Sequence, residues 1–234
     1  MKNVLITGAS RGLGFTLAEE YAAKGFFVFA CARNIESDRL KSLKEKYNNN
    51  ISLIPMDVSQ TESVEQAAKE VKQTTAYLDI IINNAAVHSE DSGAELELVN
   101  LDNCIEVYNI NVVGPLRVTK AFVSLLDNGE SKVLVNISSE SGSISDCRRE
   151  KEFDYCMSKA ALNMESKMLQ NYFMRRNIKV LAIHPGWIRT DMGGANADLS
   201  PAESAQNIIS IIEQNEENLK GPIYIDYTGK PMNY

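Results

Sequence analysis

The chain has few cysteines, few histidines and no long apolar run, and each shortage excludes a class of protein. Only four cysteines and two histidines occur among 234 residues, and the cysteines, at positions 31, 104, 147 and 156, form no CxxC pair. Metal sites and disulfide frameworks use closely spaced cysteines and histidines, so we expect neither here and interpret the thiols as reduced and mostly packed. No apolar run approaches membrane-spanning length, and no signal-peptide pattern opens the chain. The sequence therefore predicts a soluble, cytoplasmic protein.

Basic residues are outnumbered by acidic ones. The chain has 24 Lys and Arg against 31 Asp and Glu, which gives a formal net charge of −7. A nucleic-acid partner requires a basic face that displaces counterions from phosphates, so we do not expect one. The remaining composition, 44% hydrophobic and 24% charged, is typical of a globular protein, and the length is sufficient for one large core.

Short apolar runs alternate with longer amphipathic stretches along the chain. Runs that are apolar throughout are typical of strands buried on both faces, and the stretches between them predict crossover helices. We therefore expect one α/β domain over residues 1–234, with a doubly wound parallel sheet of about seven strands and helices on both faces. Capping-box patterns at 59–62 and 200–203 predict two helix starts. The predicted strands are 4–6, 26–31, 51–56, 78–82, 132–137, 179–183 and 222–226.

A glycine-rich turn joins the first predicted strand to the first predicted helix. It reads Thr-Gly-Ala-Ser-Arg-Gly-Leu-Gly over residues 7–14. Glycines here let the backbone approach a pyrophosphate, and the helix start offers free N–H groups and the positive end of its dipole. This placement indicates a Rossmann fold with a dinucleotide site. The contacts that we expect from the turn are Gly8, Ser10, Arg11, Gly12, Leu13 and Gly14.

The end of the second predicted strand indicates which dinucleotide binds. NAD-binding domains usually place an acidic residue there to accept from the ribose 2′-OH, but this strand ends Cys-Ala-Arg-Asn over residues 31–34. A 2′-phosphate instead favours guanidinium groups, which Arg33 and Arg11 are placed to supply. We therefore expect NADP, the alternative being that both arginines are solvated surface charges.

The TGxxxGxG spacing resembles that of the short-chain dehydrogenase/reductase family, and the resemblance extends along nearly the whole chain. The family pattern continues in the Asn-Asn-Ala-Ala run at 83–86, in YxxxK at 155–159 and in PGxxxT at 185–190. Ala86 stands where the family usually has glycine, which we expect to matter little if φ is negative there. The further cofactor contacts that the resemblance implies are Asp57, Val58, Asn84, Ala85, Ala86, Tyr155, Lys159, Pro185, Gly186, Ile188 and Thr190.

The tyrosine and lysine of the YxxxK pattern are candidate catalytic residues. Four residues apart on a helix, Tyr155 and Lys159 would share one face. A free tyrosine, with a pKa of about 10, is a poor proton donor near neutrality, and we expect the nearby ammonium to lower that pKa. The family resemblance assigns the second hydrogen-bond donor to Ser139, three residues before a glycine, with Ser138 as the alternative.

An asparagine completes the catalytic set that the resemblance implies. Asn111 matches the family's fourth catalytic position, a helix-kinking asparagine that holds a water linking the lysine to solvent, and the NxxG spacing favours it over Asn109. The Gly114-Pro115 pair nearby would disturb a helix ladder. The alternative is an asparagine that is bonded locally within its own helix.

These residues predict an NADP-dependent oxidoreductase that reduces an aldehyde, ketone or quinone to an alcohol. The run His-Pro-Gly-Trp-Ile-Arg-Thr-Asp-Met-Gly-Gly from 184 resembles sniffer-type carbonyl reductases and C-factor-like proteins. A nucleotide-binding regulatory protein with weak or no turnover, and an NAD-dependent alcohol dehydrogenase, are the alternatives. We interpret His184 as a structural histidine inside the strand end.

Two loops and a set of apolar helix residues complete the expectations. Residues 146–150 predict a longer loop at the cleft mouth, and 192–199 predict a short lid. Family members usually pair through the helices that contain Asn111 and Tyr155, so we expect a homo-oligomer, either a dimer or a tetramer. Met164, Met168 and Leu169 fit either that interface or an ordinary core.

Overall fold

Seven parallel strands form one sheet in the computed structural model, which describes all 234 residues. The strand order is β3-β2-β1-β4-β5-β6-β7, with the change of direction between β1 and β4. The predicted doubly wound sheet is confirmed, and each predicted strand agrees with the structure to within two residues at either end. The strands are β1 (Asn3–Thr7), β2 (Phe27–Ala32), β3 (Ile51–Pro55), β4 (Ile80–Asn83), β5 (Val133–Ile137), β6 (Lys179–His184) and β7 (Tyr224–Asp226).

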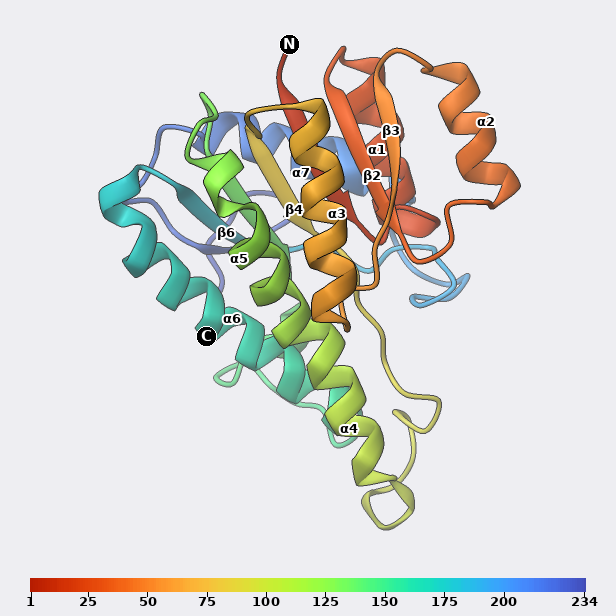
Figure 1. Ribbon diagram of the computed structural model, residues 1–234. Helices are drawn as coiled ribbons and strands as arrows, with labels where there is room; N and C mark the ends of the chain where they lie inside the picture. Colours follow the sequence, from red (N-terminus) through yellow and green to blue (C-terminus); the bar gives the residue numbers. More distant parts are fainter.

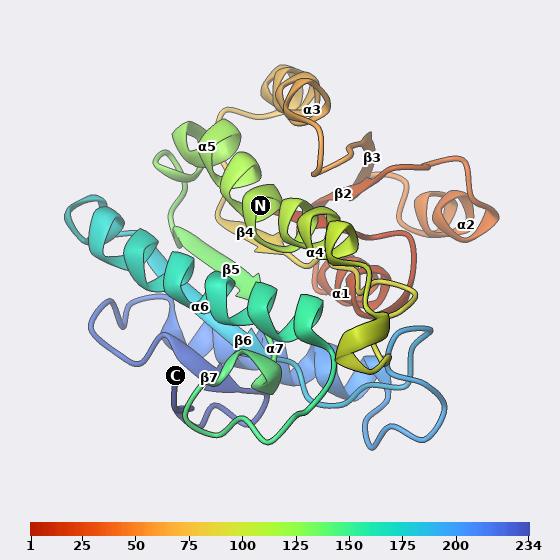
Figure 2. The same cartoon turned by 90° about the horizontal axis from the view of Figure 1, so that it is seen from below.

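Helices cover both faces of this sheet (Figures 1 and 2). One apolar core joins the sheet to α1, α2 and α7, and a second joins its other face to α3, α5 and α6. No helix combines the length and the apolar character that crossing a membrane demands, and the cytoplasmic location stays a prediction. The helices are α1 (Gly12–Ala23), α2 (Asp38–Lys46), α3 (Thr61–Thr74), α4 (Leu101–Tyr108), α5 (Gly114–Leu126), α6 (Phe153–Phe173) and α7 (Pro201–Asn215).

Alternate side chains of each central strand enter opposite cores. In β1, Val4 and Ile6 pack toward α1 and α7, whereas Leu5 packs toward α5 and α6, and all three are 0% exposed. Full burial of such a side chain stabilises the fold by about 1.5–3 kcal/mol, so both positions of the alternation select apolar residues. This two-sided burial is the physical reason that the strand runs are apolar throughout.

Of the two predicted capping boxes, one is confirmed and one is wrong. The Ser200 side chain accepts from the Glu203 backbone N–H, and the Glu203 carboxylate accepts from the Ser200 backbone N–H, so this pair closes the N-terminus of α7. At the other position, α3 begins only at Thr61 and its N-cap makes no side-chain bond. The Ser59 hydroxyl instead donates to the Asp57 carboxylate at 2.7 Å, which holds it in the turn before the helix.

A single π-helical turn, η2 (Asn109–Val113), separates α4 from α5. It ends at Gly114, and Pro115 then occupies the first turn of α5, where a missing backbone N–H costs little. The Gly114-Pro115 pair predicts an interruption of the helical hydrogen bonds, and the structure shows this interruption as a π-helical turn. It displaces the backbone of the long α4–α5 segment beside the carboxyl ends of the central strands.

Candidate active site

A cavity of about 530 Å³ opens where the carboxyl ends of the strands meet at the change of strand order. Segments that directly follow β1 to β6 line it, together with the start of α6. This is the position at which doubly wound sheets bind ligands. Of the predicted contacts, those lining the cavity are Gly8, Ser10, Arg11, Gly12, Leu13, Gly14, Arg33, Asp57, Val58, Asn84, Ala85, Ala86, Tyr155, Lys159, Pro185, Ile188 and Thr190.

Three predicted residues are not among those that line the cavity: Ser139, Asn111 and Gly186. Gly186 adopts φ +82°, and a Cβ there would lie 2.4 Å from the Leu199 side chain, so this glycine shapes the turn after β6. Ser138, the alternative to Ser139, does line the cavity. Other lining residues were not predicted, although each lies within two positions of a predicted one. They are Ala32, Asn34, Met56, Val87, Ile110, Ile137, Asp191 and Met192.

The glycine turn after β1 is shaped for close backbone approach. Gly8 and Gly12 adopt φ values of +68° and +55°, which side chains rarely tolerate. A Cβ on Gly14 would lie 2.4 Å from both the Gly8 carbonyl oxygen and the Asn84 amide. No side chain caps α1 and its first turn holds no acidic residue, so the positive end of its dipole faces the cavity uncompensated. These features fit a dinucleotide diphosphate.

The segment after β4 is attached directly to the end of β1. The Thr7 hydroxyl accepts from the backbone N–H groups of Asn84 and Ala85 at 3.0 and 3.1 Å, and the Asn84 side chain donates to the Thr7 carbonyl at 2.9 Å. Positive φ among non-glycine residues occurs only at Lys132, Glu152 and Asn177. The φ angle of Ala86 is therefore negative, as expected. Alanine in place of the family's usual glycine requires no strained backbone at this position.

The two predicted arginines differ in their surroundings. Arg33 follows β2 with an exposed side chain, and it forms no ion pair. Arg11 pairs with Asp191 at 2.9 Å, across the cavity from one lining segment to another. Both side chains of this pair are largely exposed, at 69% and 75%, so water screens the attraction. Of the two arginines, Arg33 is therefore the one whose charge is not paired within the protein.

Tyr155 and Lys159 share one face of α6, as their spacing predicts. The Lys159 Nζ lies 5.4 Å from the centroid of the Tyr155 ring. It also donates to the Ile137 carbonyl at 2.8 Å, which ties the middle of the lysine's helix to the end of β5. With only 2% of the lysine exposed, its ammonium has little access to bulk water.

The pKa values of this pair differ from the expectation. Burial raises the pKa of Tyr155 to about 12, opposed by the Ser139 hydroxyl and the Arg149 charge, so the expected lowering is wrong for the protein by itself. Burial also lowers the pKa of Lys159 to about 7, so near neutrality the ammonium is only partly formed. The tyrosine consequently keeps its proton across the physiological range, which is the form that a proton donor needs.

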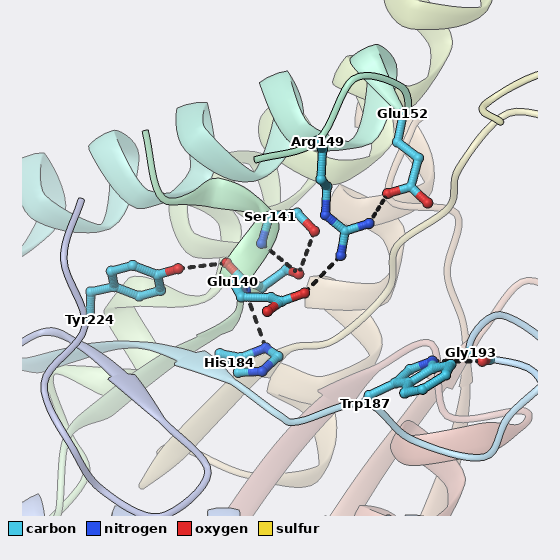
Figure 3. Close-up of polar contacts among 9 residues, drawn as sticks. Glu140, Ser141, Arg149, Glu152, His184, Trp187, Gly193 and Tyr224 are labelled. Carbon is cyan, nitrogen blue, oxygen red and sulfur yellow. Dashed lines mark hydrogen bonds and ion pairs between the residues drawn. The ribbon is translucent and has the colours of Figure 1, made fainter. Parts of the chain in front are cut away.

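The two adjacent serines after β5 have different partners. The Ser138 hydroxyl donates to the Asn163 side chain at 2.6 Å within the protein. The Ser139 hydroxyl bonds to Ser141 in η3 (Glu140–Gly142), and it lies close enough to the Tyr155 phenol to favour the ionised form. The Ser139 carbonyl accepts from the Tyr224 hydroxyl at 2.6 Å, which fixes its backbone (Figure 3). This arrangement supports Ser139 over Ser138 as the second donor.

Asn111 lies in η2 and connects three segments of the site. Its side-chain oxygen accepts from the Val87 N–H at 2.9 Å, and its amide donates to the Val87 carbonyl and to the Ser158 hydroxyl. The alternative of an asparagine bonded locally in its own helix is therefore wrong. Asn109 is directed elsewhere, with bonds to the Ser59 carbonyl and the Arg117 guanidinium.

The histidine at the end of β6 has the contacts of a structural residue. His184 Nδ1 accepts from the Glu140 backbone N–H at 3.2 Å (Figure 3). Its ring packs edge-on against Tyr227. Burial lowers the pKa of His184, so the neutral ring is favoured. No group of three or more His, Cys, Asp or Glu side chains is arranged to hold a metal ion.

Comparison with known proteins establishes the class. The family model described as short chain dehydrogenase matches residues 2–200, and the chain belongs to this family of oxidoreductases, which use NAD(P). An uncharacterized oxidoreductase of Schizosaccharomyces pombe is 29% identical over 100% of this chain and 98% of its own length. The short-chain dehydrogenase anuI of Penicillium roqueforti is 32% identical over 95% and 93% of the two chains.

Two solved structures resemble the whole chain. The carbonyl reductase Sniffer of D. melanogaster superposes with a TM-score of 0.92 at 27% identity, covering 100% of both chains. An NADPH-bound carbonyl reductase from chicken fatty liver superposes with a TM-score of 0.90 at 28% identity, covering 100% of this chain and 99% of the other.

Replacing Gly14 with alanine tests the glycine turn. In Gly14→Ala the new Cβ forces the turn away from Asn84, so we expect a loss of about 1–3 kcal/mol in the free energy of unfolding. We expect the dissociation constants of NADPH and NADH, measured by fluorescence titration, to rise about tenfold or more, equivalent to about 1.4 kcal/mol. Gly93→Ala, where a Cβ meets nothing within 4 Å, is the matched control. Equal effects at both positions would contradict the interpretation of the turn.

Proposed function

We propose that the protein is an NADP-dependent carbonyl reductase that reduces an aldehyde, ketone or quinone to the alcohol. The observation that carries this proposal is the position of the Tyr155 phenol. Burial keeps it protonated, the Ser139 hydroxyl lies beside it, and the Lys159 ammonium lies against its ring at the edge of the dinucleotide cavity. A proton donor and a second hydrogen-bond donor can then act together on one carbonyl oxygen.

The chain's own residues orient the substrate and supply the proton. NADPH, when bound, would supply a hydride to the carbonyl carbon. The hydroxyls of Ser139 and Tyr155 hold the carbonyl oxygen, and Tyr155 gives up its proton as negative charge develops there. Lys159, held by the Ile137 carbonyl, would contact the nicotinamide ribose and replenish the proton. Asn111 fixes the backbone turn along which a water would connect the lysine to solvent.

The proposed cofactor contacts follow from the segments that line the cavity. The glycine turn from Gly8 to Gly14 and the start of α1 would hold the diphosphate. Asp57 and Val58 would contact the adenine, while Asn84 to Ala86 and the segment from Pro185 to Thr190 would line the nicotinamide side. Preference for the phosphorylated cofactor would come mainly from Arg33, because Arg11 is shared with Asp191.

Large apolar side chains in the segment after β6, part of which lines the cavity, support an apolar carbonyl compound as substrate. Trp187 is 53% exposed, and its indole N–H donates to the Gly193 carbonyl at 2.8 Å, so the ring is held in place (Figure 3). Met192, which lines the cavity, is 43% exposed. A large side chain fixed by one hydrogen bond offers apolar contact area at little cost in conformational entropy.

We also propose that residues 1–234 act as one domain and that two or four copies associate. All seven strands belong to one sheet, with one continuous core on each face. Leu169 is buried, whereas Met164 and Met168 are 62% and 63% exposed, so the core interpretation is wrong for these two methionines. With Met157 and Tyr172 they form an exposed stripe along α6, beside the exposed Leu101 and Ile105 of α4. An apolar face of this kind marks a protein–protein contact.

Removing the Tyr155 hydroxyl tests the proposed reaction. In Tyr155→Phe, we expect kcat for NADPH-dependent reduction to fall by about 10²- to 10⁴-fold, because no proton donor remains. The measurement is NADPH oxidation at 340 nm against aldehydes, ketones and quinones, with NADPH binding measured separately and expected to stay unchanged. Tyr172→Phe, an exposed tyrosine on the same helix, is the control. Binding without turnover by the wild type would favour the regulatory alternative, and turnover with NAD and alcohols alone would favour the alcohol dehydrogenase.

Reversing the charge at Arg33 tests the choice of cofactor. In Arg33→Asp, loss of a charge-assisted bond to the 2′-phosphate costs about 1.5–3 kcal/mol. We therefore expect the ratio of NADPH to NADH affinity to fall by about 10- to 100-fold. Isothermal titration with both cofactors gives this ratio. Arg175→Asp makes the same charge change at an exposed position after α6 and should leave it unaltered. An unchanged ratio in Arg33→Asp would show that the arginine is only a surface charge.

A charge on the α6 stripe tests the association. Met168→Lys places an ammonium in the proposed interface, and we expect the molar mass in solution, measured by light scattering, to fall from that of two or four chains to that of one. Ile144→Lys adds the same charge at another exposed apolar residue, in the loop after η3, and should leave the mass unchanged. A wild type that is already monomeric would contradict this part of the proposal.

A further inference from the structure

The loop between η3 and α6, residues 143–152, carries an arginine that contacts both of its ends. The Arg149 guanidinium donates through Nη2 to the Glu140 carboxylate at 2.7 Å and through Nη1 to the Glu152 carboxylate (Figure 3). Nothing in the proposed reaction uses this loop. Because a guanidinium is planar and rigid, two carboxylates bound to one arginine are held at a set separation.

The two carboxylates lie next to the two groups proposed to bind the carbonyl oxygen. Glu140 directly follows Ser139 and begins η3, while Glu152 is the N-cap of α6, three residues before Tyr155. The arginine therefore joins the segment that carries Ser139 to the start of the helix that carries Tyr155. Farther along α6, the Asn163 amide donates to the Gly142 carbonyl at 3.1 Å, which holds η3 against the helix. Arg149 adds a bridge at the start of the helix, on the side of Tyr155.

The backbone at Glu152 is strained and is held by several contacts. Its φ of +62° and ψ of +41° are left-handed, a conformation that costs a non-glycine residue about 1–3 kcal/mol. The Glu152 N–H donates to the Ser92 carbonyl at 2.8 Å, and the Asp154 carboxylate accepts from Ser89 and Ser92. Together with Arg149, these contacts set the direction in which α6 starts and therefore the direction of Tyr155.

Arg149 also contributes to the charge around the Tyr155 phenol. The charged and titratable groups that influence the pKa of this phenol are Arg149 and Glu152 from the loop and Cys156 from α6 itself. Lys159 lies against the ring from the other side. Of the two loop charges, Arg149 favours the phenolate and Glu152 opposes it. Loss of the guanidinium would consequently raise the pKa of Tyr155 further.

We propose that Arg149 is a positioning residue, which sets the separation of the Ser139 and Tyr155 hydroxyls by holding Glu140 and Glu152 on one guanidinium. This inference rests on the proposed carbonyl reductase function. Each ion pair is partly exposed and contributes little to stability. Their effect is on geometry, because a displacement of about 1 Å at a reacting group lowers a rate by as much as about 10²-fold.

The test compares Arg149→Met, Arg149→Lys and the adjacent Arg148→Met, which removes a charge that forms no ion pair. Two readouts are needed, the kcat and KM of NADPH-dependent reduction and the ¹³Cζ resonance of Tyr155 in tyrosine-labelled protein, assigned with Tyr155→Phe. In Arg149→Met we expect kcat to fall by about 5- to 100-fold with unchanged NADPH affinity. We also expect the Tyr155 resonance to shift, because both the direction of the helix start and the charge near the phenol change.

The lysine variant separates geometry from charge. A single ammonium keeps the charge but does not bind both carboxylates in the planar geometry of a guanidinium, so Arg149→Lys should recover only part of kcat. If Arg149→Met does not fold, Arg149→Lys still tests the role of the two-carboxylate contact. Wild-type kcat and an unshifted resonance in both variants would overturn the inference, as would equal losses in Arg148→Met. A wild type that reduces no carbonyl would refute the proposed function alone, because the Tyr155 resonance then still decides the role of Arg149.

Discussion

The contact between the end of β1 and the segment after β4 is the constraint on which the site depends. These strands are neighbours at the point where the crossover direction changes, so the chain diverges on either side and leaves a cavity above them. The Thr7 hydroxyl and carbonyl bind the Asn84 segment, and Gly8 and Gly14 leave no room for a side chain between them. Any widening here would separate the diphosphate side of the cavity from the side that bears Tyr155.

Much of the fold could be predicted because burial on both faces leaves a simple pattern. The central strands are apolar at most positions on both faces, and the sequence predicts all seven strands with small errors at their ends. The helix start at 59–62 was wrong for a local reason. Ser59 lies three residues before Glu62, which satisfies the pattern. Its hydroxyl, however, donates to the Asp57 carboxylate, and α3 starts two residues later, at Thr61. Competition between neighbouring side chains for one hydroxyl is not visible in a spacing rule.

The site could be predicted where a motif fixes residue types and not where long-range packing decides. The glycine turn and the spacing of Tyr155 and Lys159 placed these residues around one cavity. The direction of the Tyr155 pKa shift was wrong, because desolvation outweighs the Ser139 hydroxyl and the Arg149 charge in a phenol that is enclosed by the fold. The bonds from Asn111 to Val87 and Ser158 join residues 24 and 47 positions apart, and no local pattern marks such partners.

The two loops at the cavity mouth are attached to the rest of the protein in different ways. The segment after Thr190 is held mainly by bonds within itself and to its immediate neighbours, such as the indole of Trp187 on the Gly193 carbonyl. The loop before α6 instead ends in the strained N-cap of the helix that carries Tyr155. Replacing the segment after Thr190 with that of a relative would change the substrate preference and leave the rest of the site in place. Replacing the loop before α6 would also change the turnover rate. We therefore expect new substrate preferences in this fold to arise through changes in the segment after β6.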